Sequence, residues 1–399
     1  MSSLDPLPPG ELLLHIGPFK TGTTTVQAAF HQNREALARQ GVHYAGRGSQ
    51  PMAAAMEAAG NETLPTLGQV PGEAAGRWPR LLEEVRAADA RHVVLSSEFF
   101  SGADDEHARA IVEDLGRDRT HVVVTLRPLV RIVASQWQQY VQNRIVVPYD
   151  AWLHAVLDDP DAPPTVTPSF WQRHRHDRLI ERWAAAVGTD RLTVVVVDES
   201  EPQLLPHTFE QLLGLEPGTL VARDLGANRS LTWPEVELVR TFNQGWIDAD
   251  WSMADYTRLV RFGAIRHLQR RRTAAEETRV PIPPWAVERA AAIGAEMVAG
   301  IRAGGVRIVG DLGTLADARL AQNVAAVPGR PDVPLDVAAG LLAGLVESLT
   351  RVPPGPPAGN RVVGPIEAEM RRRHEQAAGG TSRRPGVVST LLRRVFRRR

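Results

Sequence analysis

Four short apolar runs recur in the first half of the chain, and polar or turn-forming residues bound each of them. Their apolar residues are consecutive rather than alternating, which is typical of strands buried on both faces of a parallel sheet. A shorter run at residues 42–44 follows a glycine that suits a helix end, and it predicts one more strand. The four longer runs lie at residues 12–16, 92–97, 121–126 and 192–197.

Segments with helical periodicity separate these runs. An alternation of buried strands and helices is the pattern of an α/β protein, in which helices cover both faces of the sheet. We therefore predict a three-layer α/β/α fold with a central parallel sheet. The predicted helices lie at about residues 22–40, 79–90, 105–116, 129–143, 169–187 and 203–213.

From about residue 230 the pattern is mainly helical, apart from a short run at 306–309 that suits a late strand. Segments rich in proline and glycine at 328–334 and 353–360 read as linkers. Helical additions are expected at 233–246, 252–272, 285–303, 314–326 and 335–351. We predict an α/β domain with a helical second half at 1–330, a linker with helices at 331–380 and a tail at 381–399.

Composition narrows the class of protein. None of the 399 residues is cysteine, so disulfides, thiolate chemistry and cysteine-ligated metals are excluded. No apolar run approaches the roughly 20 residues that span a bilayer. The Pro-rich residues 1–10 lack the basic and apolar regions of a signal peptide. We therefore expect a cytoplasmic protein.

The charge of the chain is unevenly distributed. The net charge is zero, but residues 371–399 contain ten arginines and one acid, Glu375, so this segment carries +9 and the rest −9. Apolar residues between 387 and 396 recur with helical spacing, and arginines fill the opposite face. This pattern predicts a basic amphipathic helix in peripheral contact with the inner face of a membrane. The alternative is a disordered tail, and no DNA-binding motif points to nucleic acid.

A loop that carries two glycines, a lysine and four threonines follows the first predicted strand. A strand, a glycine-bearing loop and a helix N-terminus together present backbone N–H groups to a phosphate. Lys20 adds a compact positive charge, and it is the only lysine in the chain. Because Lys20 precedes Gly22, the loop differs from the Walker A motif, in which lysine follows the second glycine.

Two other predicted strands also end in side chains that carry chemistry. Arg127 follows one strand, and Ser135 lies eight residues later in the next helix. An arginine and a hydroxyl together can bind a phosphate. Glu98 follows the other strand almost directly. Since ligands of open α/β sheets bind at the carboxyl ends of the strands, we expect these residues to lie near Lys20.

The order Lys-Thr-Gly-Thr-Thr at residues 20–24 resembles the 5′-phosphosulfate loop of sulfotransferases, which use 3′-phosphoadenosine-5′-phosphosulfate (PAPS). Those enzymes hold the 3′-phosphate of PAPS with an arginine and a serine at the spacing of Arg127 and Ser135. The family often has an acid where Arg131 stands, which is a departure. The resemblance covers about residues 11–232 and implies these PAPS-binding residues: Lys20, Thr21, Gly22, Thr23, Thr24, Thr25, Arg127, Ser135 and, from a loop at 227–230, Arg229.

The resemblance also implies a catalytic mechanism. Glu98 stands where cytosolic sulfotransferases place a histidine base and related bacterial enzymes a glutamate. His43, at the end of the second strand, is the alternative base. In the implied in-line transfer, Lys20 stabilises the charge that grows on the leaving phosphate, and the base takes a proton from a hydroxyl or amine. Carbohydrates, glycolipids and secondary metabolites are the acceptors considered, and no metal is expected.

The acceptor pocket is expected to lie under the long Gly- and Pro-rich segment at 46–77 and the segment at 144–172. Residues 174–177, His-Arg-His-Asp, are predicted to form a solvated helix face rather than a metal site. Five aromatic residues are candidates for stacking against the acceptor: Trp137, Tyr140, Tyr149, Trp152 and Trp171.

Two other functions are compatible with parts of this pattern. One is a phosphate-loop kinase or NTPase that depends on ATP and magnesium, which the lysine-before-glycine order and the Arg127/Ser135 pair disfavour. The other is a non-catalytic, nucleotide-binding module associated with a membrane, which the intact set of Lys20, Glu98, Arg127 and Ser135 disfavours.

Overall fold

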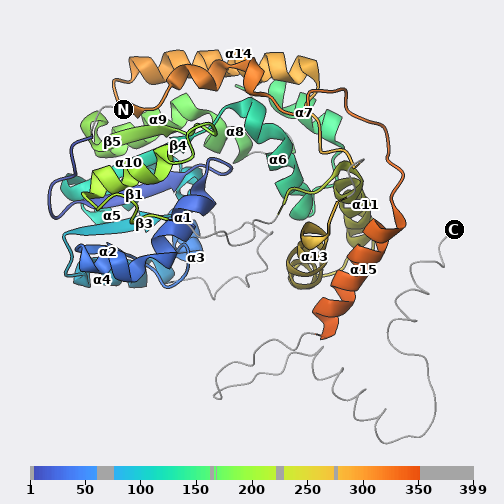
Figure 1. The fold of residues 1–399 in the computed structure, drawn as a ribbon, viewed down its shortest axis with the longest axis horizontal. Coiled ribbons are helices and arrows are strands. Elements are labelled where there is room, and N and C mark those ends of the chain that lie inside the picture. Colours follow the sequence, from blue (N-terminus) through green and yellow to red (C-terminus); the bar gives the residue numbers. More distant parts are fainter. Residues whose placement is uncertain are drawn as a thin grey trace, which may run out of the picture. The chain divides into compact units, whose positions relative to one another are not determined.

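Six parallel strands form the centre of the fold, in the order β2-β3-β1-β4-β5-β6 (Figure 1). The computed structural model describes residues 4–60, 76–161, 166–167, 169–221, 229–273 and 277–350. All the predicted strands are confirmed, and the late run at 306–309 forms the edge strand β6. The strands are β1 (Leu12–Gly17), β2 (Val42–Tyr44), β3 (His92–Ser96), β4 (Thr120–Leu126), β5 (Leu192–Val196) and β6 (Arg307–Val309).

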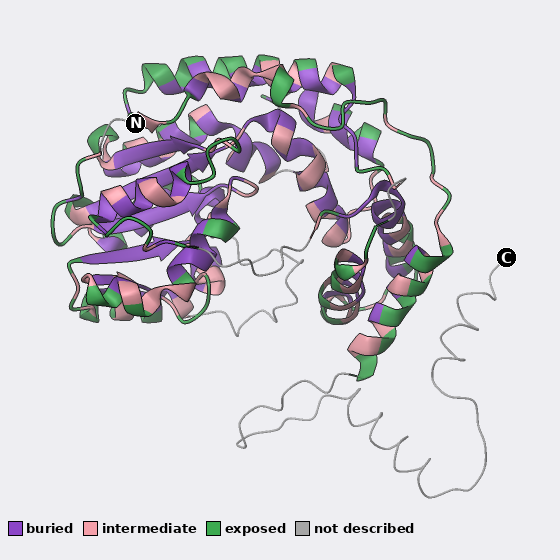
Figure 2. Ribbon diagram, in the orientation of Figure 1, coloured by how far each residue is buried: buried purple, intermediate pink, exposed green. Residues whose placement is uncertain are grey.

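The central strands are buried on both faces, as their unbroken apolar runs predict (Figure 2). Successive side chains alternate between two cores: Leu13 belongs to one, while Leu12 and Leu14 belong to the other. On the Leu13 face lie α1 (Thr23–Gln32), α2 (Arg34–Arg39) and α10 (Leu204–Leu213). On the opposite face lie α3 (Met52–Ala58), α4 (Arg77–Ala87), α5 (Asp105–Leu115) and α9 (His176–Val187). The predicted three-layer α/β/α fold is thus confirmed.

A second core consists of helices from both halves of the sequence. It combines α6 (Leu129–Gln142), α7 (Tyr149–Leu157) and α8 (Ser169–His174) with α11 (Trp233–Asp248), α13 (Ile265–Arg270) and α15 (Leu335–Thr350). The long helix α14 (Pro284–Ala303) contributes Ile293 to this core and Ile301 to the sheet core. It therefore joins the two halves of the fold.

The described residues up to Leu349 belong to one compact unit. The predicted boundaries at residues 330 and 380 stay predictions. The predicted amphipathic tail helix at 387–396 and the linker at 353–360 lie outside the described residues. Within the described residues, no helix is both long and apolar enough to cross a membrane.

Two predicted helices are wrong in detail. The expected helix at 314–326 is absent, and two 3₁₀ turns, Leu312–Ala316 and Ala318–Leu320, stand in that region. Asp311 and Asp317 each accept a hydrogen bond from the backbone two residues later, and such local bonds compete with a continuous helix. The expected helix at 252–272 is divided into α12 (Met253–Asp255), a π-helical stretch at Tyr256–Ala264, and α13.

The predicted helix at 169–187 is also interrupted. Arg175, with φ −80° and ψ 82°, leaves the helical conformation and separates α8 from α9. Its guanidinium binds Asp177 in the first turn of α9, with 3.1 Å between Nε and Oδ1. The break gives α8 its own direction, and α8 packs against the 3₁₀ helix η2 (Glu98–Gly102) at the end of β3.

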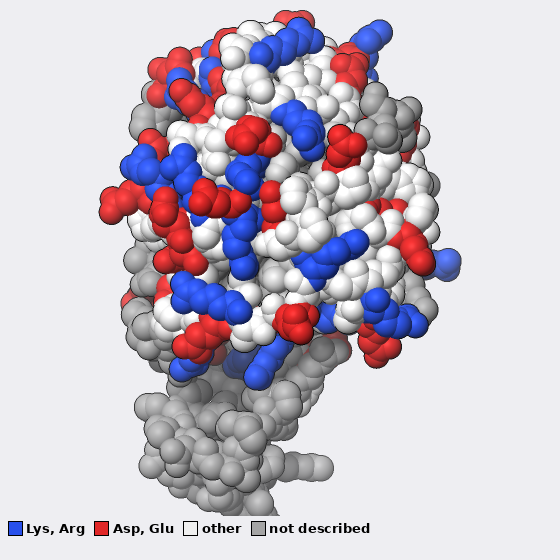
Figure 3. Space-filling model, turned by 90° about the vertical axis from the view of Figure 1, so that its left-hand side faces the viewer, with Lys and Arg blue, Asp and Glu red and all other residues white. Residues whose placement is uncertain are grey.

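The face of the molecule in Figure 3 carries arginine and acidic side chains side by side. Neither sign of charge forms a continuous field over the described residues on this face.

Candidate functional site

The loop between β1 and α1 has a backbone that few sequences allow. Gly17, Lys20 and Gly22 all have positive φ, at 82°, 66° and 88°. Thr21 holds the loop in place: its Oγ1 donates to the carbonyl oxygen of Pro18 at 2.6 Å and lies 2.8 Å from Oγ1 of Thr125 in β4. Gly22 precedes α1 and has no side chain that could cap it. The N–H groups of Thr25 and Val26 donate to the carbonyl oxygen of Gly22, which leaves those of Thr23 and Thr24 to face an anion at the helix start.

A buried polar network lies beneath this loop. The ring of His15 joins three strands, with Nδ1 2.8 Å from Oγ of Ser96 and Nε2 3.2 Å from Oγ1 of Thr125. Burial lowers the pKa of His15 to about 3, so the imidazole is neutral at physiological pH. The network ties the ends of β3 and β4 to β1 and so fixes the loop that carries Lys20.

Glu98 lies directly beside the loop. A Cβ atom added at Gly17 would lie only 2.9 Å from Cα of Glu98, so the two backbones meet where only glycine fits. The carboxylate of Glu98 accepts hydrogen bonds from Nε2 of Gln27 at 2.7 Å and from Nε2 of Gln50 at 3.2 Å. Oγ of Ser97 in turn donates to Oε1 of Gln50 at 2.7 Å. These amides hold the carboxylate in one orientation.

The end of β4 reaches the same place. Nη1 of Arg127 lies 3.5 Å from the carbonyl oxygen of Lys20, and Nζ of Lys20 donates to Oε1 of Gln139 at 3.2 Å. Gln139 lies one turn beyond Ser135 on α6. Oγ of Ser135 donates to the carbonyl oxygen of Ile132 at 2.9 Å. The three strand ends are thus brought together as the sequence predicts.

Lys20 lies close to one negative charge, Glu98, and one positive charge, Arg127. Desolvation lowers the pKa of Lys20 to about 8; the carboxylate of Glu98 opposes this shift, and the guanidinium of Arg127 adds to it. Arg127 and Arg131 both bind the carboxylate of Glu199, which follows β5. Burial of Glu199 raises its pKa, but the hydrogen bonds from the two arginines outweigh burial and lower it. Arg131, the departure from the sulfotransferase pattern, thus serves to hold Glu199.

The position in the sheet is one at which α/β proteins bind ligands. The connection after β1 enters α1 on the Leu13 face, and the connection after β3 enters α5 on the opposite face. Adjacent strands whose connections leave in opposite directions open a crevice at their carboxyl ends. The Lys20 loop follows β1 and Glu98 follows β3, so both lie at this point of the sheet.

Two predicted site residues are engaged elsewhere. His43 binds Glu84, with 3.0 Å between Nε2 and Oε1. Arg229 binds both carboxylate oxygens of Glu235 at 2.6 Å and also donates to the backbone carbonyl oxygens of Leu268 and Arg271. Its donors hold the start of α11, where Glu235 belongs to the capping box. Positions 227 and 228 of the predicted loop at 227–230 lie outside the described residues.

Several predictions about exposure are wrong. His174 and His176 are fully buried and do not form a solvated face, because the chain turns inward at Arg175. No group of three or more histidine and acidic side chains suited to a metal occurs within the described residues. Two of the five aromatic candidates, Trp137 and Trp152, are fully buried in the helical core and cannot stack on a ligand, while the nearly buried Tyr149 lines a pocket of that core instead.

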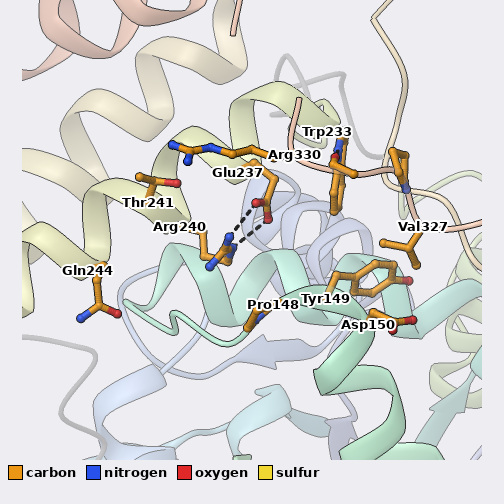
Figure 4. Close-up of a pocket in the computed structure, with 12 residues that line it drawn as sticks. Pro148, Tyr149, Asp150, Trp233, Glu237, Arg240, Thr241, Gln244, Val327 and Arg330 are labelled. Carbon is orange, nitrogen blue, oxygen red and sulfur yellow. Dashed lines mark hydrogen bonds and ion pairs between the residues drawn. The ribbon is translucent and has the colours of Figure 1, made fainter. Parts of the chain in front are cut away.

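A pocket of about 450 Å³ lies in the helical half; Tyr149, a predicted stacking residue, lines it, but none of the predicted nucleotide-binding or catalytic residues does (Figure 4). Trp233 and Tyr149 line it, and Arg240 extends toward Glu237 (Figure 4). The two side chains form a paired salt bridge with contacts of 2.8 and 2.7 Å. Because the pairing neutralises both charges, this pocket is less suited to a phosphate than the crevice at Lys20.

Sequence reasoning missed the residues that support the site. Gln27, Gln50 and Gln139 are ordinary helix and loop residues in the sequence, and nothing local marks them. His15 and Thr125 did carry a signal, because each is a polar residue within an otherwise apolar, buried strand.

Comparisons with known proteins add little. No family model matches the chain, and no curated protein matches it. Among solved structures, the chain is similar to a sulfotransferase from Alicyclobacillus acidocaldarius, with 13% identity and a TM-score of 0.37 over 62% of this chain and 98% of that one. A likeness this weak carries no argument, so the fold class rests on the parallel sheet and its helical layers.

Proposed function

We propose that this chain is a sulfotransferase that moves a sulfuryl group from PAPS to a hydroxyl or amine. The observation that carries the proposal is the convergence of Lys20, Glu98 and Arg127 at the carboxyl ends of β1, β3 and β4. An ammonium, a carboxylate and a guanidinium meet there beside an uncapped helix N-terminus. Ser135 lies one turn before Gln139, whose side chain binds Lys20.

The 5′ side of PAPS would lie on the loop at 17–22. The backbone N–H groups from Thr21 to Thr24 and the start of α1 supply hydrogen bonds and a favourable dipole for the phosphate. Lys20 supplies the charge. As the bond between sulfur and the bridging oxygen breaks, its electron pair stays on the 5′-phosphate of the leaving nucleotide, and the Lys20 ammonium stabilises the added charge.

The 3′-phosphate would bind Arg127 and Ser135. The carboxylate of Glu199 accepts hydrogen bonds from both Arg127 and Arg131. A phosphate can therefore replace Glu199 as the partner of Arg127 while Glu199 stays bound to Arg131. The hydroxyl of Ser135, bonded to its own helix at Ile132, can rotate toward the phosphate. A 3′-phosphate site distinguishes PAPS from ATP.

Glu98 is the base in this proposal. Its carboxylate accepts from Gln27 and Gln50, and an ionised carboxylate oriented in this way can accept the acceptor's proton. The acceptor oxygen or nitrogen forms its bond to sulfur as Glu98 removes the proton. His43 stays an alternative base, although its ring is bound to Glu84 in this structure.

The first test measures binding of 3′,5′-adenosine bisphosphate (PAP), 5′-AMP and ATP–magnesium by calorimetry. We expect PAP to bind at least about tenfold more tightly than 5′-AMP, since a charge-assisted phosphate contact contributes about 1.5–3 kcal/mol. Arg127→Ala should remove most of this difference.

Arg109→Ala is the control, because Arg109 is exposed on α5. Equal affinities for PAP and 5′-AMP, or binding of ATP–magnesium alone, would contradict the proposal and favour a kinase-like or non-catalytic protein.

A further inference from the structure

A buried guanidinium beside the crevice has no assigned role. Arg173 belongs to α8 and is only 5% exposed. Its Nε and Nη2 atoms have no hydrogen-bond partner, and no salt bridge to Arg173 occurs within the described residues. Its guanidinium carbon lies 4.8 Å from the centre of the Phe19 ring. Phe19 belongs to the same loop as Lys20, so the free guanidinium lies against that loop.

The surroundings of Arg173 place it beside η2 and Glu98. α8 is fastened to η2, the helix that begins with Glu98, by a 2.7 Å hydrogen bond from Nε2 of Gln172 to the carbonyl oxygen of Gly102. Burial lowers the pKa of Arg173, and the charges of Tyr140 and Glu98 oppose that shift. Glu98 is therefore close enough to interact with Arg173.

Glu98 nevertheless does not pair with Arg173. Its two carboxylate oxygens are hydrogen-bonded to Gln27 and Gln50. Tyr140 on α6 is also close enough for the charge of Arg173 to lower its pKa, but Gln136 and Ser169 hydrogen-bond the Tyr140 side chain, so the unpartnered group that matters here is the guanidinium itself. A buried cation and unsatisfied polar atoms are unfavourable unless a ligand completes them.

The two unpartnered nitrogens indicate the shape of the missing group. Nε and Nη2 lie on one edge of the planar guanidinium, and their N–H bonds point in the same direction. A carboxylate, with two coplanar oxygens, accepts both bonds at once. A neutral hydroxyl or amide oxygen can also accept from this edge, but through a single atom and without the negative charge that balances a buried guanidinium.

We infer that Arg173 binds a carboxylate of the acceptor, so that the substrate of this chain is an acidic molecule whose hydroxyl or amine then faces Glu98. The inference rests on the proposed function, because it assigns the acceptor class of the same site. The negative charge of PAPS and that of the acceptor would be met by separate cations, Lys20 and Arg127 for the nucleotide and Arg173 for the acceptor.

The experiment titrates the PAP-loaded protein with two matched pairs of probes by calorimetry. Glucuronate is compared with glucuronamide, and 4-hydroxybenzoate with 4-hydroxybenzamide. We expect at least one carboxylate to bind about tenfold or more tightly than its amide, which corresponds to the lower end of a charged hydrogen-bonded pair. Arg173→Gln should abolish this preference and change PAP affinity by no more than about twofold.

Arg178→Gln serves as the matched control, because Arg178 is half-exposed on the neighbouring helix α9. The comparison of wild-type protein with carboxylate and amide needs no variant, so it holds even where Arg173→Gln fails to fold. If no carboxylate binds the PAP-loaded wild type more tightly than its amide, the inference is wrong.

Two further readouts separate the possible failures. If PAP itself does not bind, the proposed function fails before the acceptor is tested. If Arg173→Gln weakens PAPS but neither PAP nor the carboxylate probes, the guanidinium contacts the sulfuryl group, and the acidic-acceptor inference is overturned.

Discussion

At the scale of single residues, the site depends on charges held in a partly desolvated crevice. Lys20 is the clearest case, since burial lowers its pKa to about 8 while Glu98 and Arg127 act in opposite directions. The ammonium is therefore mostly protonated at neutral pH and loses its proton slightly above it. A bound phosphate would raise the pKa of Lys20 again, because its negative charge favours the protonated ammonium.

This shift predicts a pH dependence of nucleotide binding. Above pH 8 the free protein must take up a proton at Lys20 in order to bind PAP, so affinity should fall toward tenfold per pH unit. The phosphates of PAP are fully ionised in that range and do not contribute. Titration between pH 7 and 10 by calorimetry, in buffers of different ionisation enthalpy, measures the proton uptake.

Lys20→Gln provides the comparison, because it removes the titrating group without adding a charge. It should bind PAP more weakly at pH 7 and show no fall above pH 8. An unchanged affinity of the wild-type protein up to pH 10 would mean that Lys20 does not contact the phosphate.

At the scale of elements, the loop between β1 and α1 brings Lys20 close to Glu98 and Arg127, the groups to which we assign phosphate binding and catalysis. Three residues of the loop have positive φ. Two of them, Gly17 and Gly22, are glycines, which adopt this conformation readily, and the third is Lys20. A non-glycine residue in this conformation carries strain, which tends to occur at functional sites. The close approach of Gly17 to Glu98 links the conformation of the loop to the position of Glu98, the proposed base.

Gly17→Ala tests this close approach. The added Cβ would meet the backbone of Glu98 at 2.9 Å and also take an unfavourable φ of 82°. We expect a loss of about 2–4 kcal/mol in the free energy of unfolding. Urea denaturation measures it.

Gly10→Ala is the matched control, since Gly10 has a φ of 92° but no atom within 4 Å of its added Cβ. That variant should lose only about 1 kcal/mol, the contribution of the backbone conformation alone. Equal losses in the two variants would show that the contact with Glu98 adds nothing.

At the scale of the whole molecule, several histidines are buried without charge. Burial lowers the pKa of His15 to about 3 and the pKa of His121 and His176 to about 4, and it lowers the pKa of His174 well below its usual value. Each of these groups binds a proton more readily in the unfolded chain than in the folded one. Acid therefore favours unfolding through all of them at once.

We expect the free energy of unfolding to fall steeply as pH decreases from 7 to 5. Because the folded pKa values lie below the unfolded value of 6.5, this stability is present above pH 6.5 and is lost as the pH falls toward 4. Each histidine contributes up to about 1.4 kcal/mol per pH unit below 6. Urea denaturation at a series of pH values measures the slope.

His176→Phe should reduce that slope, because it removes one buried titrating ring of similar size. His154→Gln should leave it unchanged, since the His154 side chain is half-exposed. A free energy of unfolding that stays constant between pH 7 and 5 would contradict the prediction.

The sequence by itself determined the sheet, most of the helices and the strand ends that carry chemistry. Consecutive apolar residues have a local physical meaning, burial on both faces, and the parallel arrangement then brings the ends of β1, β3 and β4 to one edge. The loop residues from Lys20 to Thr25, with Glu98, Arg127 and Ser135, are therefore predictable from the sequence alone. The proximity of Lys20, Glu98 and Arg127 is observed, while the roles of all these residues stay predictions.

Only the tertiary structure decided which side chains support that site and which are buried. Gln27 reaches Glu98 across 71 residues and Lys20 reaches Gln139 across 119, and no local pattern encodes such pairs. The same holds for Arg173 and His174, whose positions depend on the break at Arg175 and on the packing of α8 against η2. Hydrophobic periodicity predicts which residues of one helix or strand are buried. Which polar side chains form hydrogen bonds with one another depends instead on how elements far apart in the sequence pack.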